Sequence, residues 1–135
     1  MDLSQRKLTD SEINALSALA LAHVGDAVYE LFARTRIAER GKLKAKDFHR
    51  ETVKLVSAQA QSKAAELVFP SFTGDERAVY SRGRNAHSRT PGSASSAEYH
   101  AATALETLFG YLYLSGNIER ASELFELCAE VRDAV

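Results

Sequence analysis

The sequence is organised around Leu19-Ala-Leu-Ala-His-Val-Gly-Asp-Ala-Val-Tyr-Glu30, an apolar stretch that carries two acids close together. If this stretch is helical, Asp26 and Glu30 project from the same face, because residues four apart are neighbours on a helix. An acid in such a setting needs a partner, since carboxylates are almost never fully buried unless they are paired. A salt bridge, a helix cap or a bound cation could each supply that partner.

Helical periodicity extends outward from this stretch over the whole chain. Thr9 and Glu12 have the spacing of a capping box, so a helix is expected to begin there. Gly25 is expected to mark a break or a close approach, with a second helix over about 26–40 that Gly41 ends. Further helices are expected at residues 45–69, from residue 73 onward, at 99–114 and at 118–131. No alternating strand pattern occurs, so the sequence predicts an all-α fold that forms a single domain over residues 1–135.

Composition places the chain among ordinary soluble globular proteins. It has 135 residues, of which 45% are hydrophobic and 26% are charged, enough to bury a core. No apolar run reaches the roughly 18 residues of a membrane span, so no membrane association is expected. The single cysteine, Cys128, excludes an internal disulfide and a multi-cysteine zinc site, and it is expected to be a small core residue. These features are typical of the cytoplasm or another reducing compartment.

Charge is unevenly distributed, although the net charge is only −1. Residues 34–63 include nine basic and three acidic residues, and residues 77–89 include four arginines and no acid. Residues 98–135 include seven acids and two bases. This asymmetry predicts one basic and one acidic surface, unless the charges simply line solvated helix faces.

Glu106 repeats the arrangement seen at Asp26, as a single carboxylate in the apolar segment 104–114. Two isolated acids on two apolar helices, without a basic neighbour in sequence, suggest convergence on a shared cation. Mg²⁺ is the natural candidate, because it takes oxygen ligands and often uses only one or two carboxylates plus substrate phosphates. The alternatives are pairing with arginines, a position at a helix edge or, for Asp26, a place in the first turn of a helix. Zinc is disfavoured because the four histidines are scattered.

The arginine-rich segment from Arg82 to Arg89 is the best candidate for contact with nucleic acid. Arginine matches phosphate geometry, and Gly83 would let the backbone approach closely. The candidate residues are Arg82, Arg84, Asn85, His87 and Arg89. A second strip is expected at residues 57–63, where Gln59 and Lys63 could contact the minor groove of duplex RNA. The alternative for the arginine-rich segment is a solvated turn.

Three motifs, in this order, resemble the catalytic domain of the ribonuclease III family, and above all its small Mini-III group. They are Val-Gly-Asp-Ala-Val-Tyr-Glu-Leu at 24–31, Arg-Gly-Arg-Asn-Ala at 82–86 and Leu-Glu-Thr-Leu-Phe-Gly-Tyr-Leu-Tyr-Leu at 105–114. The resemblance implies a helical, homodimeric endonuclease that cleaves double-stranded RNA with Mg²⁺, for which Mn²⁺ could substitute. It also implies a bacterial cytoplasmic or plastid location and, for the Mini-III group, maturation of the large-subunit (23S) ribosomal RNA precursor.

By this resemblance, Asp26 and Glu106 are the catalytic, metal-binding acids. Larger relatives carry two further acids, at positions that Ala22 and Thr103 occupy here, and Glu30 could compensate for them. We therefore expect metal-assisted phosphodiester hydrolysis by a dimer. The apolar residues of segments 19–31 and 104–114 are expected at the dimer seam. The rival interpretations are a non-catalytic RNA-binding or assembly module with the same fold, and a helical protein-interaction module.

Overall fold

The computed structural model describes residues 2–3, 6–86 and 96–133, and the regular elements within these ranges are all helical. The α-helices are α1 (Asp10–Asn14), α2 (Ala18–Arg40), α3 (Ala45–Val56), α4 (Ala58–Val68), α5 (Gly74–Arg84), α6 (Ser96–Leu114) and α7 (Ile118–Asp133). A short 3₁₀ helix, η2 (Phe69–Ser71), follows α4. The all-α prediction is confirmed. Across the described ranges, no helix has the length and apolar character needed to cross a membrane.

Polar side chains determine where the first two helices begin. The hydroxyl of Thr9 accepts a hydrogen bond from the Glu12 N–H at 3.1 Å, and the Glu12 side chain accepts one from the Thr9 N–H at 3.0 Å. The predicted capping box is therefore confirmed. The helix that it starts is short, however, because Ser17 has extended backbone angles and caps a new helix, α2, through the N–H of Ala20.

Helix α2 runs without interruption through Gly25. The predicted break at Gly25 is wrong, whereas the close approach offered beside it is confirmed. Asp26 consequently lies in the interior of the helix, so the helix-dipole explanation for this acid does not apply. Gly41 ends the helix at a φ of 68°, as predicted.

The single helix predicted over residues 45–69 is two helices, α3 and α4. Ser57, with φ −61° and ψ 153°, ends α3 and at the same time caps α4 by accepting a hydrogen bond from the Ala60 N–H at 3.2 Å. Apolar periodicity continues across this residue, which explains why the pattern reads as one helix. Pro70 ends the α4 segment within η2, as expected.

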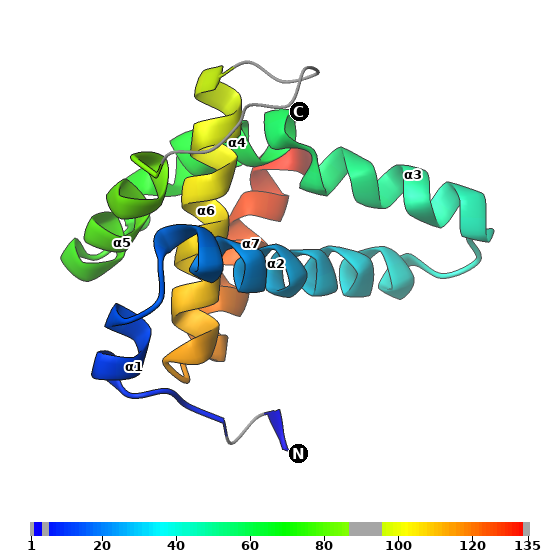
Figure 1. Cartoon of the computed structure of the whole chain (residues 1–135). Coiled ribbons are helices and arrows are strands. Elements are labelled where there is room, and N and C mark those ends of the chain that lie inside the picture. The colour runs from blue at the N-terminus through cyan, green and yellow to red at the C-terminus, as the bar shows by residue number, and fades with distance from the viewer. Residues whose placement is uncertain (1, 4–5, 87–95, 134–135) are drawn as a thin grey trace.

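Helix α6 forms the centre of the fold, and α2, α4, α5 and α7 pack around it. Figure 1 shows α2 crossing α6, while the C-terminal half of α2 and the contacting helix α3 extend away from the rest of the molecule. Leu105, Leu108 and Phe109 of α6 are fully buried. Leu105, Leu108 and Phe109 are therefore core residues, and they do not take part in the dimer seam predicted for segment 104–114.

Candidate active site

Helices α2 and α6 cross at a point where each contributes a glycine. A Cβ atom on Gly25 would lie 1.6 Å from the carbonyl oxygen of Glu106, and one on Gly110 would lie 2.0 Å from the carbonyl oxygen of Leu21. No larger side chain fits at either position, so the two backbones come into direct contact. Because Asp26 directly follows Gly25, this crossing places Asp26 next to Glu106.

The side chains of Asp26 and Glu106 lie close enough to share a hydrogen bond. Two carboxyl groups can form such a bond only when one of them carries a proton. Burial is the main cause that raises the pKa of Glu106, and the charge and hydrogen bond of Asp26 add to it, so that the pKa reaches about 8. The geometry thus places a Glu106 carboxyl group with a raised pKa beside Asp26, and a divalent cation could take the place of the Glu106 proton.

The two positions at which the family resemblance implies further acids in larger relatives carry no acid here. Ala22 and Thr103, at the corresponding positions, are buried. The charge of Glu30 contributes to the raised pKa of Glu106, but the Glu30 carboxylate also pairs with Arg34 at 3.4 Å. In the described part of the chain, no group of three or more His, Cys, Asp or Glu side chains is placed to hold a metal ion. A cation at this site would therefore need water or phosphate oxygens for most of its ligands.

Gln61 of α4 is a residue of the site that sequence reasoning does not single out. Its side chain is buried, at 1% exposure, and its amide interacts with the Glu106 carboxyl group in a way that favours the ionised form. Its Nε2 atom nevertheless has no hydrogen-bond partner of normal geometry. Its spacing in the sequence could have identified it. Gln61 precedes the buried residues Ala65 and Val68 by four and seven positions, so it lies on the buried face of α4.

The end of α5 lies against the same turn of α6 that carries Glu106. Gly83 is buried there, and a Cβ atom on it would lie 2.4 Å from Oγ1 of Thr107. Gly83 therefore allows two helices to pack closely, and the expectation that it allows approach to a phosphate is wrong. Two residues predicted on the same segment, His87 and Arg89, lie outside the described residues.

Three other predicted RNA-contact residues are exposed at the C-terminal end of α5, and two of them also make contacts within the fold. The Arg82 guanidinium group donates a hydrogen bond to the carbonyl oxygen of Leu16, in the connection before α2. Arg84 lies beside the hydroxyl of Tyr80, one turn earlier on α5, and its positive charge acts on that group. Asn85 ends α5 as its C-cap. Arg82 thus has a structural contact to the segment before α2, whereas Arg84 lines a hollow that α4, α5 and α6 share.

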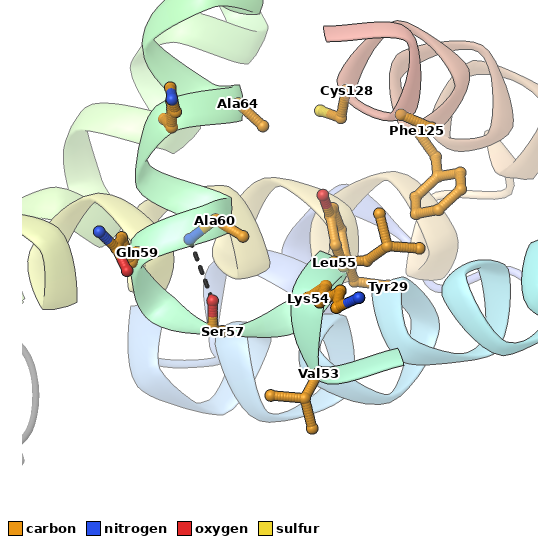
Figure 2. A pocket seen from close by; sticks show the side chains of 12 residues that line it. Tyr29, Val53, Lys54, Leu55, Ser57, Gln59, Ala60, Ala64, Phe125 and Cys128 are labelled. Carbon is orange, nitrogen blue, oxygen red and sulfur yellow. Dashed lines mark hydrogen bonds between the residues drawn. The ribbon is translucent and has the colours of Figure 1, made fainter. Parts of the chain in front are cut away.

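In the second predicted strip, at residues 57–63, Gln61 is buried whereas Gln59 and Lys63 face outward. Gln59 and Lys63 are exposed and line a cavity of about 360 Å³ to which α2, α3, α4 and α7 all contribute. Figure 2 shows Gln59 on the side of α4 that is turned away from Cys128. Cys128 is a core residue, as predicted, and burial raises the pKa of its thiol to about 12. Neither Asp26 nor Glu106 lines this cavity, which is therefore distinct from the acid pair.

Comparisons with known proteins give one consistent result. Residues 19–117 match the family described as Ribonuclease III domain. The Mini-ribonuclease 3 of Symbiobacterium thermophilum is 45% identical over 116 residues, which cover 85% of this chain and 89% of that protein. The Mini-ribonuclease 3 of a Thermoanaerobacter species is 39% identical over 125 residues, which cover 92% of this chain and 88% of that protein. A crystal structure of a protein from Fusobacterium nucleatum matches with a TM-score of 0.77 at 26% identity, covering 91% of this chain and 97% of that one.

Proposed function

This chain belongs to the ribonuclease III family and is an endoribonuclease of that type, and from this premise we propose that Asp26 and Glu106 are its catalytic, metal-binding pair. The observation that carries the proposal is the contact between these two carboxyl groups at the crossing of α2 and α6. Mg²⁺ suits a donor set of two carboxylates completed by water and substrate phosphate, and Mn²⁺ could replace it. The raised pKa of Glu106 supports the same assignment, because a buried acid whose pKa is perturbed by a neighbouring charge is typical of functional sites.

The two acids have different places in the proposed reaction, which is hydrolysis of a phosphodiester bond. When bound, Mg²⁺ supplies a Lewis acid for the scissile phosphate and lowers the pKa of a water molecule. Asp26 is exposed, so its carboxylate can face the incoming RNA backbone. Glu106 is recessed behind it on the buried helix α6, and this rigid setting fixes the position of the second carboxylate.

We propose that the substrate of this enzyme is the double-stranded stem of the large-subunit (23S) ribosomal RNA precursor, processed in the bacterial cytoplasm or the plastid stroma. The family acts on double-stranded RNA. Exposed Arg82, Arg84 and Asn85 lie on the helix that packs beside Glu106, so their contacts with phosphates would bring the backbone to the acid pair. Gln59 and Lys63 would extend the contact along the duplex.

We also propose that the enzyme acts as a homodimer. One face of α2 is exposed although it is largely apolar, with Leu19 at 40% and Leu31 at 66% exposure, and His23 and Ala27 lie between them at intervals of four residues. Residues at this spacing share one face of a helix, which a second copy could cover. A two-fold dimer would present one acid pair to each strand of an RNA duplex.

The test is cleavage of a structured duplex RNA with and without Mg²⁺ or Mn²⁺. We expect Asp26→Asn and Glu106→Gln each to reduce the rate more than about 100-fold, because partners that only orient metal ligands are already worth 10- to 100-fold. Circular dichroism and RNA binding should stay unchanged. Glu119→Gln, which removes an exposed acid at the start of α7, is the matched control. Metal-dependent cleavage by Asp26→Asn at the wild-type rate would refute the assignment.

A further inference from the structure

Gln61 lies at the acid pair with a buried side-chain N–H that has no hydrogen-bond partner of normal geometry. Its side chain is 1% exposed, and it reaches Glu106 from α4, a third helix beside the two that carry the acids. Among buried side chains of the described residues, its Nε2 is the polar atom that has no hydrogen-bond partner. Buried polar groups are nearly always paired, so this amide calls for an explanation.

Packing alone does not explain a glutamine at this position. The neighbouring core positions of α4 are taken by Ala64, Ala65 and Val68, and an apolar residue of similar volume would fill the space without leaving a donor unpaired. An unpaired buried amide costs stability in the folded protein. Buried polar groups without a partner occur mainly at functional sites, where a bound ion or ligand completes the arrangement of hydrogen bonds.

The chemistry of the amide fits the Glu106 carboxylate. An N–H donor directed at a carboxylate stabilises its ionised form and fixes its orientation, and a neutral amide does so without adding a charge that would repel a cation. A lysine or arginine at the same place would compete with the cation for the carboxylate. Because Ala22 and Thr103 supply no additional acids, the orientation of the two acids that remain has to be set by other groups.

We propose that Gln61 is a positioning residue for Glu106: its amide N–H donates to the Glu106 carboxylate when a divalent cation is bound, and so holds that carboxylate in its ligating orientation. This inference rests on the proposed function, in which Asp26 and Glu106 hold the cation. Gln61 itself acts through Glu106 and not on the RNA.

The experiment measures metal binding without RNA, by calorimetric titration of the full chain with Mn²⁺ and by the thermal shift that Mg²⁺ produces. We expect Gln61→Met, an unbranched replacement of similar volume, to weaken metal affinity about 10- to 100-fold. In the presence of a chelator, its thermal midpoint should equal or exceed that of the wild type, because the unpaired donor is gone. Gln61→Leu provides a second apolar variant, and Ser62→Ala, on the next residue of α4, is the control with unchanged affinity.

A purely structural role predicts the opposite result. If Gln61→Met lowers the thermal midpoint in chelator and binds Mn²⁺ with wild-type affinity, the inference is overturned. Asp26→Asn, titrated in parallel, separates this failure from a failure of the proposed function. Loss of Mn²⁺ binding in Asp26→Asn but not in Gln61→Met or Gln61→Leu refutes only the role of Gln61. Wild-type Mn²⁺ binding by Asp26→Asn refutes the metal site itself, and the role of Gln61 with it.

Discussion

Gly25 of α2 and Gly110 of α6 meet backbone to backbone: a Cβ atom on Gly25 would lie 2.7 Å from the Gly110 nitrogen, and one on Gly110 would lie 3.1 Å from the Gly25 nitrogen. The contact sets the distance between the two helices, and with it the distance between the carboxyl groups of Asp26 and Glu106. The same two glycines therefore support both the core and the candidate active site.

We expect Gly25→Ala to destabilise the fold by at least about 2 kcal/mol, because the added methyl group would overlap the backbone oxygen of Glu106, which cannot move without separating the helices. Urea denaturation followed by circular dichroism measures the change. Gly74→Ala is the control, since a Cβ atom at Gly74 meets nothing within 4 Å. Equal midpoints for the two variants would contradict the proposed role of the crossing.

The raised pKa of Glu106 predicts how stability depends on pH in the metal-free protein. Its value of about 8 in the folded state exceeds the ordinary value of 4.5, so between these pH values the folded protein retains a proton that the unfolded chain has released. The contribution of Glu106 to the free energy of unfolding must therefore decrease as pH rises through this window, by at most about 1.4 kcal/mol per pH unit. Denaturation in the presence of a chelator should reveal this slope in the wild type and its loss in Glu106→Gln. Identical pH profiles for the two proteins would contradict it.

Features encoded by neighbouring residues are predictable from the sequence, and features that depend on distant partners are not. The capping box of Thr9 and Glu12 lies within one turn, and the structure confirms it. Gly25 reads equally well as a helix break, because the group that requires a glycine there, the backbone carbonyl of Glu106, is far away along the chain. Gln61 reads as part of a polar strip for the same reason, since the group it faces lies on another helix.

The acid pair itself is suggested by the sequence only in part. Asp26 and Glu106 stand out because each is a lone acid in an apolar helix, and the family motifs connect them. Their contact depends on the crossing of α2 and α6, which periodicity cannot supply. Ser57 illustrates a similar limit: a serine in a helical pattern is compatible with a helix interior or with a cap, and the packing of α3 and α4 decides between them.

Arg120, in the first turn of α7, forms a salt bridge with Glu76, in the first turn of α5. Its Nε and Nη2 atoms donate to the two carboxylate oxygens of buried Glu76 at 2.8 and 2.9 Å, and Nη2 also donates to the Ser71 carbonyl oxygen at 2.9 Å. We expect Arg120→Met to cost about 3 kcal/mol in thermal or urea denaturation, because it leaves the Glu76 charge buried and unpaired. Arg50→Ala, which breaks an exposed pair with Asp47, should cost less than about 1 kcal/mol. Equal losses would contradict the proposed importance of burial.

Arg84→Ala should weaken binding of duplex RNA and reduce the salt dependence of the affinity by about one phosphate contact. Binding is best measured on the Asp26→Asn protein, so that the RNA stays intact. Arg77→Ala is the matched control on the same helix, because the Arg77 guanidinium group lies over the Phe69 ring, 4.7 Å from its centroid. If the Asp26→Asn protein has the same salt dependence of RNA affinity with and without Arg84→Ala, the RNA interface does not include the end of α5.

Arg82→Ala should combine a loss of RNA binding with a loss of stability. Its guanidinium group donates to the carbonyl oxygen of Leu16, so the substitution removes a charge from the proposed RNA surface and also a hydrogen bond between α5 and the connection before α2. We expect a decrease of about 1 kcal/mol in the free energy of unfolding, measured by urea denaturation, together with a shallower salt slope. Arg82→Lys should restore most of the salt slope, since it keeps the charge, but only part of the stability. Full stability in Arg82→Ala would show that the contact with Leu16 contributes nothing to the fold.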